Sequence, residues 1–153
     1  SRARLINASI SGETTAGAAH NLPGLLQKHR PRIVILAIGA NDGLRGHLPA
    51  AIFMNLAAMI EQSHQAGSAV VLTGIDIPSN YGPAYREAFR SVYIKLAADY
   101  DIAFIASLFD EIYSRPHLLQ GDGLHPNETA QHLIADRIFP VLKARLNCIP
   151  IFL

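Results

Sequence analysis

The chain has 153 residues, half of them hydrophobic, which is typical of one globular domain with a single buried core. Its 13 basic and 12 acidic residues are scattered along the sequence, and the formal net charge of +1 gives no reason to expect nucleic-acid binding. Apolar runs such as residues 33–38 are far shorter than the roughly 20 residues that cross a bilayer, so we expect no stable membrane insertion.

The single cysteine, Cys148, has no partner for an internal disulfide. It lies in an apolar stretch without a histidine or an acidic residue close to it in sequence, which favours a structural or incidental role over a catalytic thiol. No secretory signal peptide is recognisable, but the chain begins with Ser rather than Met. The sequence therefore leaves the compartment open.

Short apolar segments predict four β-strands, at residues 5–10, 33–38, 69–73 and 102–106. The second segment is the clearest, because its apolar residues follow one another without a polar interruption. Such a run is typical of a strand that is buried on both faces.

Helices are expected between these strands. The first ends near His29, and Pro23 and Gly24 are expected to kink it or to delay its start. Pro49 reads as the first turn of the second helix, which Gly67 ends. Its predicted apolar stripe comprises Ala50, Phe53, Ala57 and Ile60.

The third helix follows Pro83, and its predicted apolar face comprises Phe89, Val92, Tyr93 and Leu96. The last helix runs from Glu128 to about Leu146, with Asn127 as its N-cap and a kink expected at Pro140. Its predicted stripe comprises Leu133, Ile134, Ile138 and Val141.

The alternation of strands and helices, without internal repeats, predicts an α/β sandwich around a parallel sheet. Open parallel sheets bind their ligands just past the carboxyl ends of the strands. The apolar run that ends at Ile38 opens into the turn-forming sequence Gly-Ala-Asn-Asp-Gly. We therefore expect a site near Asn41.

Two turns offer hydrogen-bond donors for such a site. At Ser11-Gly12 the glycine lets a backbone N–H approach a ligand oxygen closely, although a glycine needed only for the turn is an equally good interpretation. Asn41 can aim its side-chain NH₂ into a cleft as an oxyanion donor. The alternative, which the local sequence alone favours, is an asparagine that caps its own turn.

A third turn, residues 121–127, combines Asp122 with His125 in a glycine-rich loop. A carboxylate three residues before an imidazole can accept the Nδ1–H bond and leave Nε2 free as a general base. The alternative is an ordinary surface histidine. A metal site is a weaker interpretation, because no third histidine or cysteine stands at a ligand spacing.

Four blocks, in order along nearly the whole chain, together resemble the SGNH (GDSL-like) hydrolases. The closest resemblance is to the bacterial thioesterase I, lysophospholipase and arylesterase branch. The blocks are Asn-Ala-Ser-Ile-Ser-Gly-Glu-Thr at 7–14, Gly-Ala-Asn-Asp-Gly-Leu-Arg-Gly at 39–46, Ile-Pro-Ser-Asn-Tyr-Gly at 77–82 and Asp-Gly-Leu-His-Pro-Asn at 122–127.

This resemblance implies a three-layer α/β/α sandwich with a flavodoxin-like parallel sheet, and hydrolysis of acyl esters and thioesters by a Ser-His-Asp mechanism. It implies that His125 is the base, Asp122 its orienting acid, and Gly12 and Asn41 the oxyanion hole. No metal or organic cofactor is implied, and the compartment suggested is the periplasm or the outside of the cell. The residues implied to contact the acyl substrate are Asp42, Gly43, Leu44, Ile77, Pro78 and Tyr81.

The family's first block, which carries the nucleophilic serine, is absent from this sequence. Ser9 and Ser11 belong to the second block and are interpreted as strand and turn residues. We therefore expect residues 1–153 to be one hydrolase domain that lacks the first strand and first helix. The missing segment would belong to a longer chain or be a separate chain, and the chain alone should be nearly inactive.

Two other functions fit the same residues. One is a carbohydrate acetylesterase of the same superfamily, which a panel of short acyl sugars, acyl thioesters and lysophospholipids would separate. The other is a non-catalytic remnant that binds an acyl group without cleaving it.

Overall fold

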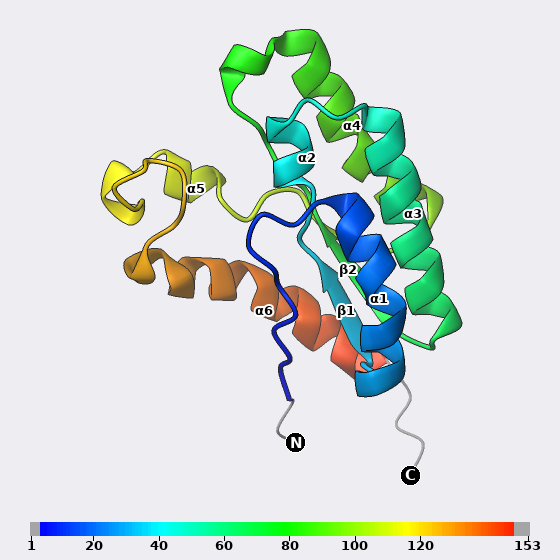
Figure 1. Ribbon diagram of the computed structural model, residues 1–153. Coiled ribbons are helices and arrows are strands. Elements are labelled where there is room, and N and C mark those ends of the chain that lie inside the picture. Colours follow the sequence, from blue (N-terminus) through cyan, green and yellow to red (C-terminus); the bar gives the residue numbers. More distant parts are fainter. Residues whose placement is uncertain (1–3, 149–153) are drawn as a thin grey trace.

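The computed structural model describes residues 4–148, which form a parallel three-stranded sheet with helices on both faces (Figure 1). The strand order is β1-β2-β3, with β1 at Ile33–Leu36, β2 at Ala69–Thr73 and β3 at Ala103–Ile105. In the register, Val34 lies opposite Val70, and Leu72 lies opposite Phe104. The predicted α/β class and parallel sheet are confirmed.

Two helices begin at the prolines that the sequence predicts, whereas the last α-helix begins at Gln131, after a 3₁₀ turn that starts at the predicted Glu128 and is capped by Asn127. Thr14 caps the first helix by accepting a hydrogen bond from the N–H of Gly17, and Pro49 and Pro83 occupy the first turns of two others. The α-helices are α1 (Thr15–His29), α2 (Ala40–Leu44), α3 (Pro49–Gln65), α4 (Pro83–Asp99), α5 (Asp110–Tyr113) and α6 (Gln131–Cys148), and 3₁₀ turns lie at Ser79–Tyr81, Pro116–Leu118 and Glu128–Ala130.

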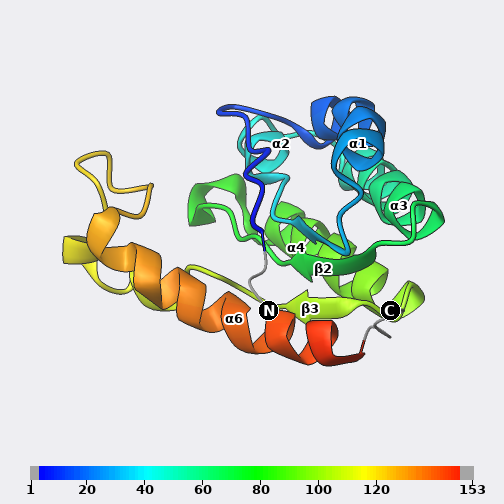
Figure 2. The ribbon, with the colours of Figure 1, turned by 90° about the horizontal axis from the view of Figure 1, so that it is seen from below.

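Two hydrophobic cores, one on each face of the sheet, define the three layers (Figure 2). Helices α1, α3 and α4 cover one face, where their leucine, isoleucine and aromatic side chains pack against Leu36, Val70 and Leu72. Helix α6 covers the other face, where Ile134 and Ile138 pack against Val71 and Ile105. Three residues of the predicted stripe of α6, Ile134, Ile138 and Val141, therefore face the sheet, whereas Leu133 packs against the smaller cluster of Ile112, Leu118 and Ala130.

The buried face of α4 consists of the four residues that its apolar spacing predicts. In α3 the prediction is partly wrong: Ile52, Leu56, Met59 and Ile60 are buried, whereas Ala50 is exposed and Phe53 and Ala57 are half-buried. The reason is that α3 is apolar around much of its circumference. Spacing alone could not identify the side that packs against α1 and α4.

The strand expected at residues 5–10 does not form. This segment has no regular secondary structure, and the side chains of Leu5 and Ile10 are 84% and 56% exposed. A strand needs a partner for its backbone N–H and C=O groups. Within residues 4–148, no strand offers those groups to this segment.

Strand β1 is an edge strand rather than the doubly buried strand that its sequence predicts. Only Leu36 is fully buried, whereas Ile33, Val34 and Ile35 are half-buried. Among the described residues β1 pairs only with β2, so its second edge presents unpaired backbone groups.

Two smaller predictions about the helices need correction. Helix α1 is not delayed but begins at Thr15 and continues through Pro23 and Gly24. Helix α6 contains Pro140, and the kink expected there stays a prediction. Residues 40–44, which read as a turn, form the short helix α2. The side chain of Cys148 lies outside the part of the chain that the structure describes, so its predicted role stays a prediction.

No helix within residues 4–148 combines the length and apolar character needed to cross a membrane.

Helix α2 approaches the core closely through Gly43. A Cβ atom at this position would lie 2.6 Å from Ile77 Cγ2 and 2.9 Å from Phe89 Cε2. We predict that Gly43→Ala lowers the free energy of unfolding by about 1–3 kcal/mol through overpacking. Gly24→Ala is the control, because its Cβ would meet nothing within 4 Å and helix propensity favours alanine by up to about 1 kcal/mol. Urea unfolding measures both, and equal midpoints for the two variants would contradict this packing.

Candidate active site

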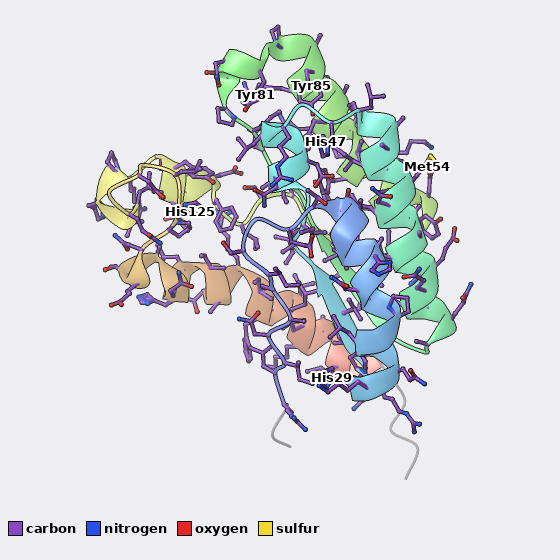
Figure 3. The ribbon with its side chains drawn as sticks, in the orientation of Figure 1. His29, His47, Met54, Tyr81, Tyr85 and His125 are labelled. Atoms are coloured by element: carbon purple, nitrogen blue, oxygen red, sulfur yellow. The ribbon has the colours of Figure 1, made fainter. Side chains whose placement is uncertain are left out.

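The candidate residues come from three separate segments. Gly12 precedes α1, Asn41 lies on α2 just after the carboxyl end of β1, and the loop with Asp122 and His125 comes between α5 and α6, where Figure 3 shows His125. The expectation of a site near Asn41 rests on its position past the carboxyl end of a parallel strand.

Asp122 and His125 form a hydrogen-bonded pair. His125 Nδ1 lies 2.6 Å from Asp122 Oδ2, and the side chains are 65% and 46% exposed. The other carboxylate oxygen, Oδ1, accepts hydrogen bonds from the backbone N–H groups of Leu124 and His125, at 2.9 and 3.0 Å. Because a carboxylate can only accept, Nδ1 donates and Nε2 is left available to act as a base.

These donors stabilise the ionised form of Asp122. The hydrogen bond from His125, followed by those from the backbone of Leu124 and His125, holds the pKa of Asp122 well below its usual range. The carboxylate is therefore charged at neutral pH and fixes the orientation of the imidazole.

A small satellite core positions this loop. Ile112, Leu118 and Ala130 are buried together beneath it. Asn127 accepts a hydrogen bond from the N–H of Ala130, and its Nδ2 donates to the carbonyl groups of His117 and Leu119. The predicted N-cap thus also closes the base of the loop that presents His125.

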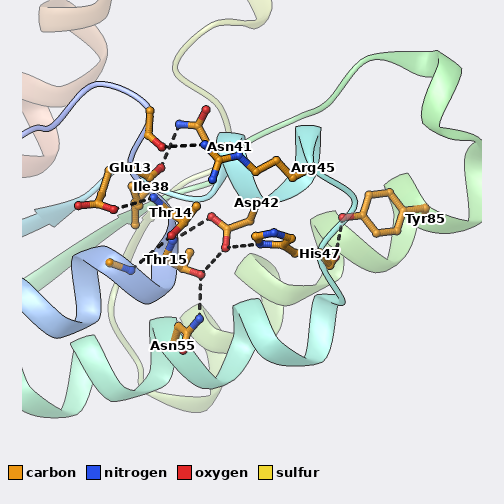
Figure 4. Close-up of polar contacts among 12 residues, drawn as sticks. Glu13, Thr14, Thr15, Ile38, Asn41, Asp42, Arg45, His47, Asn55 and Tyr85 are labelled. Carbon is orange, nitrogen blue, oxygen red and sulfur yellow. Dashed lines mark hydrogen bonds and ion pairs between the residues drawn. The ribbon is translucent and has the colours of Figure 1, made fainter.

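The Gly12 turn and helix α2 are tied together by two side chains (Figure 4). Asn41 Nδ2 donates to the carbonyl of Glu13 over 2.9 Å, and Arg45 Nη2 donates to the carbonyl of Gly12 over 3.3 Å. Gly12 has φ +76°, a conformation that favours glycine. Asn41 therefore does not simply cap its own turn, and its second N–H remains available for another acceptor.

Asp42 is the most buried charged group of the site, with 1% of its surface exposed. Its two oxygens accept hydrogen bonds from the backbone N–H of Thr15 at 2.8 Å and from Thr15 Oγ1 at 2.6 Å. His47 Nδ1 lies 3.4 Å from Oδ1, and Asn55 Nδ2 donates to Thr15 Oγ1. This burial means that the carboxylate supports the site from inside and is not exposed to a ligand.

The structure joins the two segments that the resemblance assigns to the acyl substrate. Gly43 packs against Ile77, and the Tyr81 hydroxyl donates to the carbonyl of Leu44 over 2.6 Å. Arg86 holds the second segment in place through Nε, which donates to the carbonyl of Ile77, and an ion pair with Asp76. Pro78 is exposed beside them. That these residues contact substrate stays a prediction.

The Asp122–His125 pair is not joined to the oxyanion-hole candidates. Its hydrogen bonds stay within residues 120–125, and Figure 3 shows His125 on a lobe apart from His47, Tyr81 and Tyr85. Within residues 4–148 no serine hydroxyl bonds to His125. Ser9 and Ser11 lie on the exposed N-terminal segment.

The sequence did not reveal the residues that organise this site from within. Thr15, Asn55 and His47 surround Asp42 but belong to no recognisable motif. The one available signal was Thr15 at the start of a helix. Among the described residues, no cluster of three or more His, Cys, Asp or Glu side chains could hold a metal ion.

Residues 1–133 match the model of the GDSL-like lipase/acylhydrolase family. The chain belongs to this family. It is similar to esterase TesA of Pseudomonas aeruginosa, with 41% identity over 94% of this chain and 71% of that protein. It is also similar to thioesterase 1/protease 1/lysophospholipase L1 of Escherichia coli K12, with 39% identity over 96% of this chain and 71% of that protein. The resemblance seen in the four sequence blocks is confirmed.

A solved structure supports the same relationship. The psychrotrophic esterase EstA from Pseudoalteromonas sp. superposes with a TM-score of 0.88, at 40% identity, over 93% of this chain and 78% of that chain. This chain therefore has the α/β fold of its family.

The contact between Thr15 and Asp42 gives a prediction about stability. Thr15→Val keeps the shape but removes the hydroxyl that donates to a buried carboxylate, so the free energy of unfolding should fall by about 1.5–3 kcal/mol. The control is Thr129→Val at an exposed position, where a change within about 0.5 kcal/mol is expected. Urea denaturation measures both. A Thr15→Val protein as stable as the control would show that the hydroxyl contributes little.

The contact between His125 and Asp122 gives a prediction about pH. In the folded protein the lowered pKa keeps the Asp122 carboxylate ionised even at pH values below its usual pKa of about 3.9, and the charge is lost only as the pH falls through the lowered pKa. His125→Ala removes the largest cause, so the titration midpoint of the Asp122 carboxyl carbon, measured by ¹³C NMR, should rise. His117→Ala changes a neighbouring exposed histidine and should leave the midpoint where it is. Equal midpoints in the two variants would contradict the assignment.

Proposed function

We propose that this protein is a serine hydrolase that cleaves acyl esters and thioesters. The observation that carries the proposal is the 2.6 Å hydrogen bond between Asp122 and His125 in a member of the GDSL-like family. Its relatives include proteins named as esterase, arylesterase and thioesterase 1/lysophospholipase L1, which supports carboxylic esters and thioesters as the substrate class.

In the proposed reaction, His125 Nε2 removes the proton from a serine hydroxyl, whose oxygen then attacks the acyl carbonyl carbon. His125 returns that proton to the departing alcohol or thiol as the acyl–oxygen or acyl–sulfur bond breaks. Water then attacks the acyl carbon while His125 takes its proton. The acyl–serine bond breaks, His125 returns the proton to the serine oxygen, and the acid product leaves. Asp122 keeps Nδ1 protonated and stabilises the imidazolium that forms at each transfer.

We assign the oxyanion hole to the Gly12 N–H and the second side-chain N–H of Asn41. The bond from Asn41 to the Glu13 carbonyl supports this assignment, because it links the two donors before substrate arrives. Donors fixed in advance stabilise the developing negative charge without reorganising, and one such donor typically contributes about 10²- to 10³-fold in turnover.

We propose that the acyl group lies against the joined segments of α2 and residues 77–81. Leu44, Pro78 and Tyr81 offer the partly or fully exposed, mainly apolar part of this surface, and the buried residues Asp42, Gly43 and Ile77 support it from inside. Cleavage of lipid-like acyl chains would place the protein in lipid metabolism, and the resemblance suggests a periplasmic or secreted enzyme.

We further propose that residues 1–153 are one hydrolase domain completed by a segment that carries the nucleophilic serine, either in the same chain or as a separate one. Two observations support this. The free edge of β1 and the exposed side chains of Leu5 and Ile10 leave unpaired backbone and apolar surface beside the sheet. Within residues 4–148, no serine reaches His125.

An activity assay tests the proposal. The protein with its serine-bearing segment should hydrolyse p-nitrophenyl butyrate and palmitoyl-CoA, and His125→Ala should lower turnover by about 10⁶-fold. His117→Ala is the matched control and should retain activity. The 153-residue chain alone should hydrolyse neither substrate above the level of its own His125→Ala variant. Clear hydrolysis by that chain would contradict an external nucleophile, and full activity of His125→Ala would contradict the mechanism.

A further inference from the structure

Three tyrosine hydroxyls donate to backbone carbonyl groups of the segment that carries Asn41. Tyr81 donates to Leu44 and Tyr85 to His47, each over 2.6 Å, and Tyr93 donates to Ile38 over 3.1 Å. The donors lie on or just before α4, and their rings form a tilted ladder with Phe89. These three hydrogen bonds thus anchor residues 38–47 to α4 and to the turn before it. Figure 4 shows the bond from Tyr85.

Tyr93 differs from the other two because it is in the core, with 1% of its surface exposed. Its acceptor, Ile38, lies beyond the β1–β2 ladder, which ends at Leu36 and Leu72. Since Ile38 has no strand partner at that point, the hydroxyl of Tyr93 satisfies its carbonyl group.

Gly39, the residue after Ile38, lies very close to the Tyr93 hydroxyl. Gly39 has φ +121°, and a Cβ atom there would lie 2.0 Å from Tyr93 Oη. Gly39 also begins α2, and its carbonyl accepts the N–H of Gly43. The hydroxyl therefore fixes the peptide from which α2 starts, two residues before Asn41.

The hydroxyl remains a donor under all ordinary conditions. Burial, followed by the nearby charge of Asp42, raises the pKa of Tyr93 far above its usual value. The phenol is thus protonated at any pH at which the protein would work.

We propose that Tyr93 is a positioning residue for Asn41: its hydrogen bond to Ile38 sets the start of α2, and hence the direction of the free Asn41 N–H toward the oxyanion. This inference rests on the proposed function of Asn41. Two other hydrogen bonds, in which Asn41 donates to the carbonyl of Glu13 and Asp42 accepts the N–H of Thr15, join α2 to the start of α1. The Tyr93 bond constrains the end at which the helix leaves the sheet.

The kinetic test uses the serine-containing protein and Tyr93→Phe, which removes only the hydroxyl. Because a misdirected donor loses part of the roughly 10²- to 10³-fold contribution of an oxyanion-hole group, kcat should fall about tenfold or more while KM changes by less than about twofold. In an Asn41→Ala background the same substitution should change kcat by less than about twofold. Tyr100→Phe, which removes a hydroxyl bonded to Glu61, is the control and should leave both constants unchanged.

Equal losses in the two backgrounds, or a loss confined to KM, would overturn the proposal. If Tyr93→Phe fails to fold, 4-fluorophenylalanine at position 93 fills the space of the hydroxyl without donating, and the same results are expected.

A second readout does not depend on activity. The side-chain N–H resonances of Asn41, observed by NMR, should shift in Tyr93→Phe and remain in place in Tyr100→Phe. Unchanged resonances in Tyr93→Phe would overturn the proposal even if kcat fell. Absence of hydrolysis by the unsubstituted serine-containing protein would contradict the proposed function, whereas the resonances would still test the link from Tyr93 to Asn41.

Discussion

The buried carboxylate of Asp42 is the contact on which the candidate site depends. It accepts both the backbone N–H and the hydroxyl of Thr15, at the N-terminus of α1, where the helix dipole favours a negative charge. This joins α1 to α2 across 27 residues of sequence. Because α1 follows the Gly12 turn and α2 carries Asn41, this buried contact fixes the two segments that carry the oxyanion-hole candidates relative to each other.

The second constraint is the open edge of β1. A parallel strand satisfies its backbone on both sides only when it has two neighbours, and β1 has one among the described residues. The same edge explains why residues 5–10 form no strand and why Ile33, Val34 and Ile35 of β1 are only half-buried.

The base and the oxyanion donors are held by independent means. The loop with His125 depends on a small satellite core and on Asn127, whereas Asn41 depends on α1, α3 and the tyrosines of α4. In the proposed mechanism the substrate and the nucleophilic serine would occupy the space between these two parts. This division accounts for the absence of a direct hydrogen bond between His125 and Asn41.

The sequence by itself determined the family, the order of most strands and helices, and the pairing of Asp122 with His125. These features depend on local periodicity, on capping residues and on groups three residues apart, which short stretches of chain encode. It could not determine that residues 5–10 stay unpaired, which face of α3 is buried, or that the Asp42 carboxylate points inward. The tertiary structure alone decided these, because each depends on a neighbour distant in sequence. A strand exists only with its partner, and a carboxylate is buried only where donors such as those of Thr15 compensate its charge.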